Sequence, residues 1–334
     1  MNMKIALHII GNKILGEGAG FSDEELTISE ETQELLHNYF LGSFKSEETY
    51  QFYSDSYLEN NIAYKVVSEM FREQSLFIDN SRNLGRLLYD AAENPRIQGG
   101  ELFVVYFEAE DESEVDKIGI FKTEKREPFL KILPANNEPI EVDKGVSLAK
   151  IDKAALIFNK DKETGYVLQV VDNNKNGDMY YWFEDFLKVR QREDDYFHTS
   201  ESLTIFKDYV KKQLPVEFEV SKADQADFLN KSINFFKEKE EFKLEEFTHE
   251  VFEDKAVIES FNNFKTDYEQ DMQVNVAEEF PINTSAVKKS QKHFKSIIKL
   301  DKNFHLYIHG DRKMLESGTD EKGNFYKVYF EKES

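Results

Sequence analysis

The spacing of the hydrophobic residues changes several times along this chain, and this limits the fold more than any other feature of the sequence. Between Ser29 and Pro95, and again over residues 181–268, they recur at the three- and four-residue intervals of amphipathic helices. Between Gly99 and Val171 they form short extended runs separated by polar, turn-rich stretches, which is typical of a meander-like sheet. The pattern predicts an α+β protein with N-terminal helices packed on a mainly antiparallel sheet, a helical middle segment and a small C-terminal β segment.

Local signals place the individual elements. A strand is expected from Lys4 to Ile14, and a helix is expected to begin at Ser29, whose side chain can cap it. Two further helices are expected within residues 59–93. The remaining expected elements are strands at 102–107, 117–122, 128–133, 154–159, 166–171, 294–300, 304–310 and 323–331, and helices near 181–188, 200–213, 223–237, 244–252 and 255–268.

The chain is long enough for two or three domains, because one hydrophobic core rarely serves 334 residues. Its 29 phenylalanines and 16 tyrosines indicate an aromatic interior. Composition and charge divide it into an N-terminal α+β domain at 1–195, an acidic helical segment at 196–280 and a basic β segment at 281–334.

Several functional classes are excluded or disfavoured by what the sequence lacks. It contains no cysteine, which excludes disulfides, zinc–thiolate sites and cysteine nucleophiles. It has no Gly-x-Ser-x-Gly motif, and no stretch approaches the roughly 20 apolar residues of a membrane span. The first apolar run is too short for a signal peptide. We therefore expect a cytoplasmic protein without membrane contact, cofactor, metal or catalytic residues.

The charge of the chain is strongly negative but unevenly distributed. Its formal net charge of −22 comes from 43 basic and 65 acidic residues, and such a charge repels polyanions at long range. The net charge is −16 over residues 1–195 and −10 over 196–280, but +4 over 281–334. Contact with a nucleic acid would therefore need a local basic patch.

One such patch is predicted near the C-terminus. Its candidate phosphate contacts are Lys288, Lys289, Lys292, Lys295, Lys299, Lys302, Arg312 and Lys313. On a helix, Lys288, Lys292, Lys295 and Lys299 would line one side, and on a strand Lys295 and Lys299 would share a face. Such a patch can neutralise several phosphates, although an ordinary solvated basic face would give the same pattern.

Two other segments each allow two interpretations. Residues Asp172–Asp178 begin like a calcium-binding loop, but Phe183 occupies the twelfth position where a bidentate glutamate belongs, which favours a plain turn. The aromatic run Tyr180–Arg192 could stack on nucleobases. One helical face nevertheless carries Trp182, Phe183, Phe186 and Leu187, which favours a buried stripe.

The order and spacing of five pieces resemble a bacterial family, the 37-kDa nucleoid-associated proteins of the NdpA type. These pieces are Ile5-Ala6-Leu7-His8, Gly99-Gly100 before an extended run, Leu148-Ala149-Lys150-Ile151-Asp152, Phe183-Glu184-Asp185-Phe186-Leu187 and Glu279-Phe280-Pro281. The resemblance implies an α+β protein found with the bacterial nucleoid, binding of double-stranded DNA and no established enzymatic activity. It supplies no catalytic residues. The turn Asp172–Asp178 is basic in relatives but holds one lysine and two aspartates here, which moves the expected DNA contact to the C-terminal lysines.

The hypothesis is therefore a non-enzymatic, nucleoid-associated protein that binds double-stranded DNA, or nucleoid proteins, weakly and without strong sequence preference. An alternative is an acidic adaptor or DNA mimic that docks on a basic DNA-processing protein. A third possibility is an enzyme with a divalent-cation site at the Asp172 turn. Scattered lysines would favour the adaptor, and carboxylates converging near Asp172 and Asp178 in a cleft would favour the enzyme.

Overall fold

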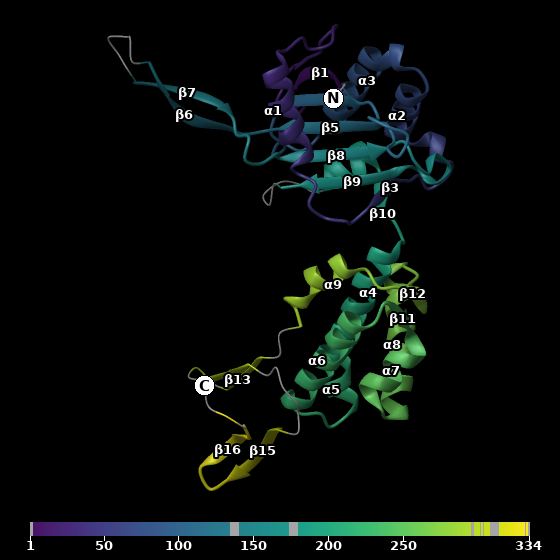
Figure 1. Ribbon diagram of the computed structural model, residues 1–334, viewed down its shortest axis with the longest axis vertical. Helices are drawn as coiled ribbons and strands as arrows, with labels where there is room; N and C mark the ends of the chain where they lie inside the picture. The colour runs from purple at the N-terminus through teal and green to yellow at the C-terminus, as the bar shows by residue number, and fades with distance from the viewer. Residues whose placement is uncertain are drawn as a thin grey trace. The chain divides into compact units, whose positions relative to one another are not determined.

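The computed structural model describes residues 3–133, 140–173, 180–294, 297–300, 302, 304–307, 314–330 and 332. The chain divides into two compact units, Met1–Arg192 and Glu193–Ser334, which are described separately (Figure 1). A further division of the second unit at residue 280 stays a prediction. No helix among the described residues is both long and apolar enough to cross a bilayer.

The first unit is built on an eight-stranded antiparallel sheet (Figure 1). In spatial order its strands are β10 (Val189–Gln191), β3 (Tyr50–Phe52), β9 (Val167–Asp172), β8 (Lys153–Phe158), β5 (Lys117–Thr123), β4 (Gly100–Phe107), β1 (Met3–Ile10) and β2 (Ala19–Gly20). The close approach of β4 to the end of β5 requires a glycine, because a Cβ on Gly100 would lie 1.8 Å from the Thr123 carbonyl oxygen.

Helices cover both faces of this sheet, so its central strands are apolar on both sides. On one face Leu102, Val104 and Tyr106 pack in a core shared with helices α2 (Ile62–Arg72) and α3 (Phe77–Ala91) and the π-helix η4 (Tyr181–Leu187). On the other face the alternate residues of β4 pack with α1 (Glu30–Leu41), whose Phe40 ring stacks on Phe121 at 4.3 Å. Short 3-10 turns complete the unit: η1 (Leu58–Asn60), η2 (Gln74–Leu76) and η3 (Lys162–Thr164).

Most of the predicted elements of this unit are confirmed, but three differ. The expected strand at 128–133 is present as β6 (Arg126–Ile132), yet it does not join the main sheet, because it pairs with β7 (Ile140–Val146) in a separate hairpin. The first strand was expected to reach Ile14 but ends at Ile10. The helix near 181–188 is a π-helix, whose wider turn buries Tyr181 with Trp182 and leaves Phe183 only half-buried.

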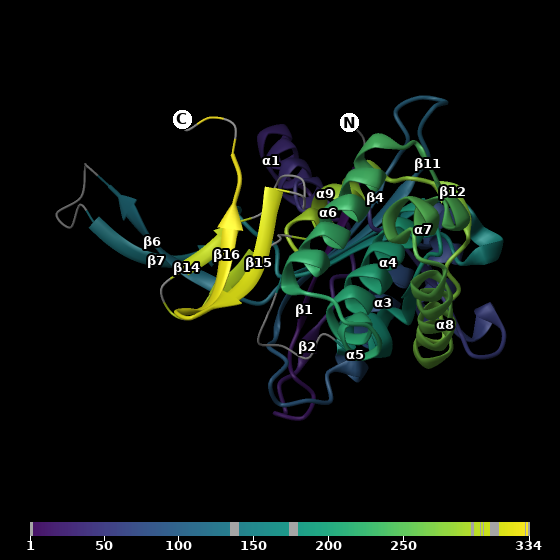
Figure 2. The ribbon, with the colours of Figure 1, turned by 90° about the horizontal axis from the view of Figure 1, so that it is seen from below.

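The second unit is mainly helical (Figures 1 and 2). Its helices are α4 (Asp195–Asp208), the π-helix η5 (Tyr209–Gln213) that continues it, α5 (Leu214–Glu217), α6 (Lys222–Glu238), α7 (Leu244–Phe252), α8 (Lys255–Met272) and α9 (Thr284–Gln291). A short ladder pairs β11 (Glu241–Lys243) with β12 (Glu279–Pro281). Phenylalanines fill the core, where Phe206 lies 5.3 Å from Phe252 and 5.1 Å from Phe247 between ring centroids.

Two small hairpins follow the helices of this unit, which confirms the predicted small C-terminal β segment. One pairs β13 (Ile297–Leu300) with β14 (Phe304–Tyr307), and the other pairs β15 (Leu315–Asp320) with β16 (Gly323–Val328). Ile298 and Leu315 pack with Ala223 of α6, which attaches both hairpins to the helical unit. The helix α9 precedes them; Asn283 caps it by accepting a hydrogen bond from the Ala286 amide at 2.9 Å.

His8, in the first of the five family-like pieces, is fully buried in the first unit. Its Nε2 lies 3.0 Å from the Ser81 hydroxyl, and its Nδ1 accepts a hydrogen bond from the Ser22 amide at 3.1 Å. Burial, and secondly the nearby positive charge of Arg82, lowers the pKa of His8 from 6.5 to about 4. The ring is therefore neutral at pH 7 and has a structural role.

This lowered pKa predicts a specific acid sensitivity. Because the folded protein binds the His8 proton more weakly than the unfolded chain, stability is complete above pH 6.5 and falls as the pH drops towards 4. Between pH 7 and 4, wild type should lose up to about 3 kcal/mol more than His8→Gln, which keeps a polar side chain but does not titrate. Urea unfolding of both proteins across this range measures the difference, and parallel curves would contradict the assignment.

Candidate nucleic-acid interface

The predicted phosphate contacts fall on two structural elements. Lys288 and Lys289 lie in the last turn of α9 and Lys292 follows as its C-cap, where the helix dipole favours positive charge. Lys299 lies in β13, and Lys302 lies in the turn that follows it. All five residues are exposed. Lys295, Arg312 and Lys313 lie outside the described residues.

Packing of α9 against α4 brings Lys292 close to two lysines that the sequence analysis did not single out. Lys211, in η5, donates a hydrogen bond from Nζ to the His293 carbonyl oxygen at 3.2 Å. Partial desolvation, followed by the positive charges of Lys292, Lys207 and Lys211, lowers the pKa of His293. We refer to Lys207, Lys211, Lys292 and His293 as the His293 cluster.

An acidic residue, Asp208, lies beside the cluster. It lies 3.5 Å from Lys207 and 2.9 Å from Lys212, which is outside the cluster. The pKa of Lys211 is lowered, first by desolvation and then by the positive charge of Lys207, although Asp208 acts in the opposite direction. A site of crowded ammonium groups gains free energy when an anion such as a phosphate binds.

Lys289 also contacts α4, the helix that carries Lys207 of the cluster. Its Nζ lies 5.5 Å from the centroid of the Tyr196 ring in α4, a cation–π distance. Lys299 and Lys302 belong instead to the β13–β14 hairpin, which is attached to α6 through Ile298. Of the predicted phosphate contacts, Lys292 therefore belongs to the His293 cluster. Lys289 lies beside Tyr196 of the same helix, α4, without belonging to the cluster.

A signal for the missed lysines is present in the sequence. Lys207 and Lys211 are four residues apart in a predicted helix, so they share one face. These two lysines were missed because residues 196–280 carry a net charge of −10. The net charge of a segment does not show which of its charged side chains share a face.

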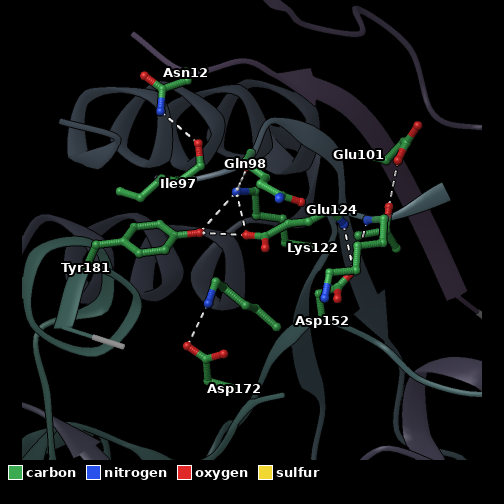
Figure 3. A network of polar contacts seen from close by, with 12 residues as sticks. Asn12, Ile97, Gln98, Glu101, Lys122, Glu124, Asp152, Asp172 and Tyr181 are labelled. Carbon is green, nitrogen blue, oxygen red and sulfur yellow. Dashed lines mark hydrogen bonds and ion pairs between the residues drawn. The ribbon is translucent and has the colours of Figure 1, made fainter. Parts of the chain in front are cut away.

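The first unit contains a second group of charges, a buried network around Lys122 and Lys153 (Figure 3). Lys122 donates from Nζ to the Gln98 carbonyl at 2.6 Å, to Glu124 at 2.9 Å and to the Tyr181 hydroxyl at 3.0 Å. Lys153 pairs with Asp172 at 2.6 Å, and both of these side chains are only 1% exposed. Both lysines lie near the Tyr181 ring, at 5.4 and 5.1 Å from its centroid.

This arrangement fits a structural network better than a catalytic one. Burial lowers the pKa of Lys122 and raises the pKa of the Tyr181 hydroxyl, but both groups are enclosed and hydrogen-bonded within the protein. Asp172, the first residue of the cation site considered in the sequence analysis, forms an ion pair with Lys153. Asp178 lies outside the described residues. In the described part of the chain, no three His, Asp or Glu side chains gather in a way that could hold a metal ion.

The aromatic run is divided between the core and the surface. Trp182 is fully buried and lies 5.0 Å from Phe186, and Leu187 is also buried, which confirms the predicted core stripe for these three residues. Phe183 differs: with Tyr50, Tyr53 and others it lines an open pocket of about 520 Å³. The wide π-helical turn explains why Phe183 leaves the buried face.

The fold and these sites define a two-unit α+β protein with a lysine cluster on a helical unit of an otherwise acidic chain. A family model, NA37, described as nucleoid-associated protein YejK, matches residues 6–322. The chain belongs to this family, which confirms the resemblance and supports a nucleoid-associated role. No curated protein matches the chain.

Proposed function

We propose that this nucleoid-associated protein binds duplex DNA directly, weakly and without strong sequence preference, and that it acts without catalysis. The C-terminal lysine patch and the His293 cluster would supply the contacts. The observation that carries the proposal is the convergence of Lys292, Lys207 and Lys211 around His293. It offers concentrated positive charge in a chain whose net charge would otherwise repel DNA.

The chemistry of lysine explains the expected weak sequence preference. An ammonium group binds a phosphate as a point charge, and phosphate contacts position a protein on the duplex without reading its sequence. Lys288, Lys292 and Lys299 are exposed, so each can reach a phosphate without a large desolvation cost. The net charge of −22 opposes this attraction and keeps the affinity low.

The alternative of an acidic adaptor also has an observation in its favour. Lys299 and Lys302 lie on a different element from Lys292, and such separation suits an ordinary solvated surface. In that case the acidic surface would dock on a basic DNA-processing protein. The two proposals differ in whether the purified chain binds duplex DNA by itself.

We predict that Lys211→Gln/Lys292→Gln binds duplex DNA less tightly and less salt-sensitively than wild type. If both lysines contact phosphates, the plot of log K against log salt should become shallower by about 2. The matched control is Lys243→Gln/Lys255→Gln, which removes the same charge from exposed positions outside the cluster. Fluorescence anisotropy with a labelled duplex measures both. Equal effects of the two variants would show that only net charge matters and would contradict a localised interface.

A further inference from the structure

The β6–β7 hairpin projects from the first unit as an isolated arm (Figure 1). Every residue of β6 is exposed, and so are five of the seven residues of β7. An isolated two-stranded hairpin is marginally stable in water, and further strands are normally needed to stabilise it. The arm therefore presents a surface suited to a partner.

One face of the arm is aliphatic. Leu130 pairs with Val142 and Ile132 pairs with Ile140, so the four side chains share a face. They are 59–71% exposed. The opposite face carries Glu127, Phe129 and Lys131 on β6, and their partners on β7 include Glu141 and Asp143.

The base of the arm is fixed by the buried network (Figure 3). Asp152 accepts hydrogen bonds from the amides of Glu124 at 2.7 Å and Lys125 at 3.3 Å, directly before β6 begins. Glu124 is also paired with the buried Lys122. Arg126, the first residue of β6, forms an ion pair with Glu101 of β4. These contacts hold the arm in one direction, which lowers the entropic cost of docking it.

The charges of the arm disfavour a nucleic-acid partner. Residues 125–146 contain four basic and four acidic residues, so the arm is neutral in a chain of net charge −22. A neutral arm offers no net attraction to phosphates. It does allow two acidic chains to approach each other at the part of the molecule where they repel least.

The open edge of β6 can pair with a second copy of itself. Pro128 has no amide hydrogen, so in its ladder with β7 it must occupy a position whose nitrogen faces away from β7. Leu130 and Ile132, two and four residues further on, therefore direct their backbone groups to the same open edge. Pro128 weakens this edge by one donor but leaves its carbonyl available.

Charge favours one register for this pairing, because only the pair centred on Phe129 places oppositely charged residues of β6 across from each other. In an antiparallel pair centred on Phe129, Glu127 lies opposite the partner's Lys131 twice, and the two Phe129 rings meet. Centring the pair on Glu127 or Lys131 would place like charges opposite each other. On β7, centring on Val142 would oppose Glu141 with the partner's Asp143, so that edge is disfavoured.

We propose that the chain forms a two-fold dimer through antiparallel pairing of β6 with β6 of a second copy, centred on Phe129. The product is a four-stranded sheet whose one face joins the aliphatic residues of both arms. Opposite charges flank the centre on the other face. Such a dimer would also carry two copies of the lysine patch, so that weak contacts could act together.

Sedimentation velocity of the full chain, without DNA, tests the dimer independently of DNA binding. As its concentration is raised to about 100 µM, wild type should reach a sedimentation-derived mass of twice the 39.2 kDa of the chain. This concentration range detects weak association. Glu127→Lys and Lys131→Glu should each weaken the dimer roughly tenfold or more, because both cross-copy pairs become repulsive.

Mixing the two single variants gives the sharpest result. In the mixed dimer the new lysine faces the new glutamate and the native pair is retained, so dimers should return. The double variant Glu127→Lys/Lys131→Glu should also dimerise. Restoration shows that the arm still folds in each variant.

Three results would overturn the proposal. They are a wild type that stays monomeric, a dimer insensitive to both single changes, and single variants that fail to combine. A monomer that instead floats with phosphatidylcholine vesicles would assign the aliphatic face to lipid.

Discussion

Lys153→Ala is expected to lower the free energy of unfolding by about 3–5 kcal/mol, because it leaves a buried carboxylate without its ammonium partner. Lys153 and Asp172 are each 1% exposed and lie 2.6 Å apart. Water cannot replace the lost charge without entering the end of the sheet. The Tyr181 ring, 5.1 Å from the Lys153 Nζ, also loses a cation–π contact.

Two further variants distinguish the loss of the Lys153–Asp172 ion pair from a general effect of removing a positive charge. Lys150→Ala removes an exposed lysine that donates to the Asn173 carbonyl at 2.9 Å, and it should change stability by no more than about 0.5 kcal/mol. Lys153→Met/Asp172→Leu removes both charges and should recover most of the loss. Chemical denaturation of the four proteins is the measurement. A Lys153→Ala protein as stable as wild type would show that the network does not hold the sheet.

The long elements of the fold could be predicted because their patterns extend over many residues. Helices α6, α7 and α8 lie close to their expected positions, as do β4, β5, β8 and β9. The strands β3 and β10 have three residues each, too few for a recognisable alternation. Their pairing depends on where the rest of the chain brings them.

The β6–β7 arm and the π-helix show a different limit. A run such as Pro128-Phe129-Leu130 has strand character whether it lies inside a sheet or projects from it, because the sequence records propensity and not the partner. The π-helix depends on a single extra residue in a turn, which moves Phe183 out of the stripe that contains Trp182 and Phe186.

The candidate sites were predictable only where charge is contiguous in the sequence. The C-terminal lysines form a visible run, but the cluster that includes Lys292 also needs Lys207 and Lys211, more than 80 residues earlier in an acidic segment. The buried network is similar: Lys122 meets Tyr181 across 59 positions of the chain. Contacts between distant residues follow from tertiary packing, which no local pattern specifies.

Direct binding of duplex DNA is the central claim, and its salt dependence should be large. If Lys288, Lys292, Lys295 and Lys299 each neutralise one phosphate, these four lysines should contribute a slope near −4 to the plot of log K against log salt, about −0.9 for each contact, and a contact by Lys211 would add to it. At physiological salt the dissociation constant should be on the order of 10⁻⁴ to 10⁻⁶ M. Changing all four lysines to glutamine should remove most of the slope. The loss should be similar on unrelated duplexes, because phosphate contacts carry no sequence information.

The most direct measurement is therefore a salt titration of duplex binding by wild type and the four-lysine variant, each followed by fluorescence anisotropy on two unrelated sequences. The account predicts that the slope of the variant is shallower than that of wild type by about 3 to 4 on both duplexes, and that the small remaining slope reflects Lys207 and Lys211, which the variant keeps. Equal slopes for the two proteins would contradict the lysine interface. Absence of wild-type binding even at low salt would contradict direct DNA binding and favour the acidic adaptor.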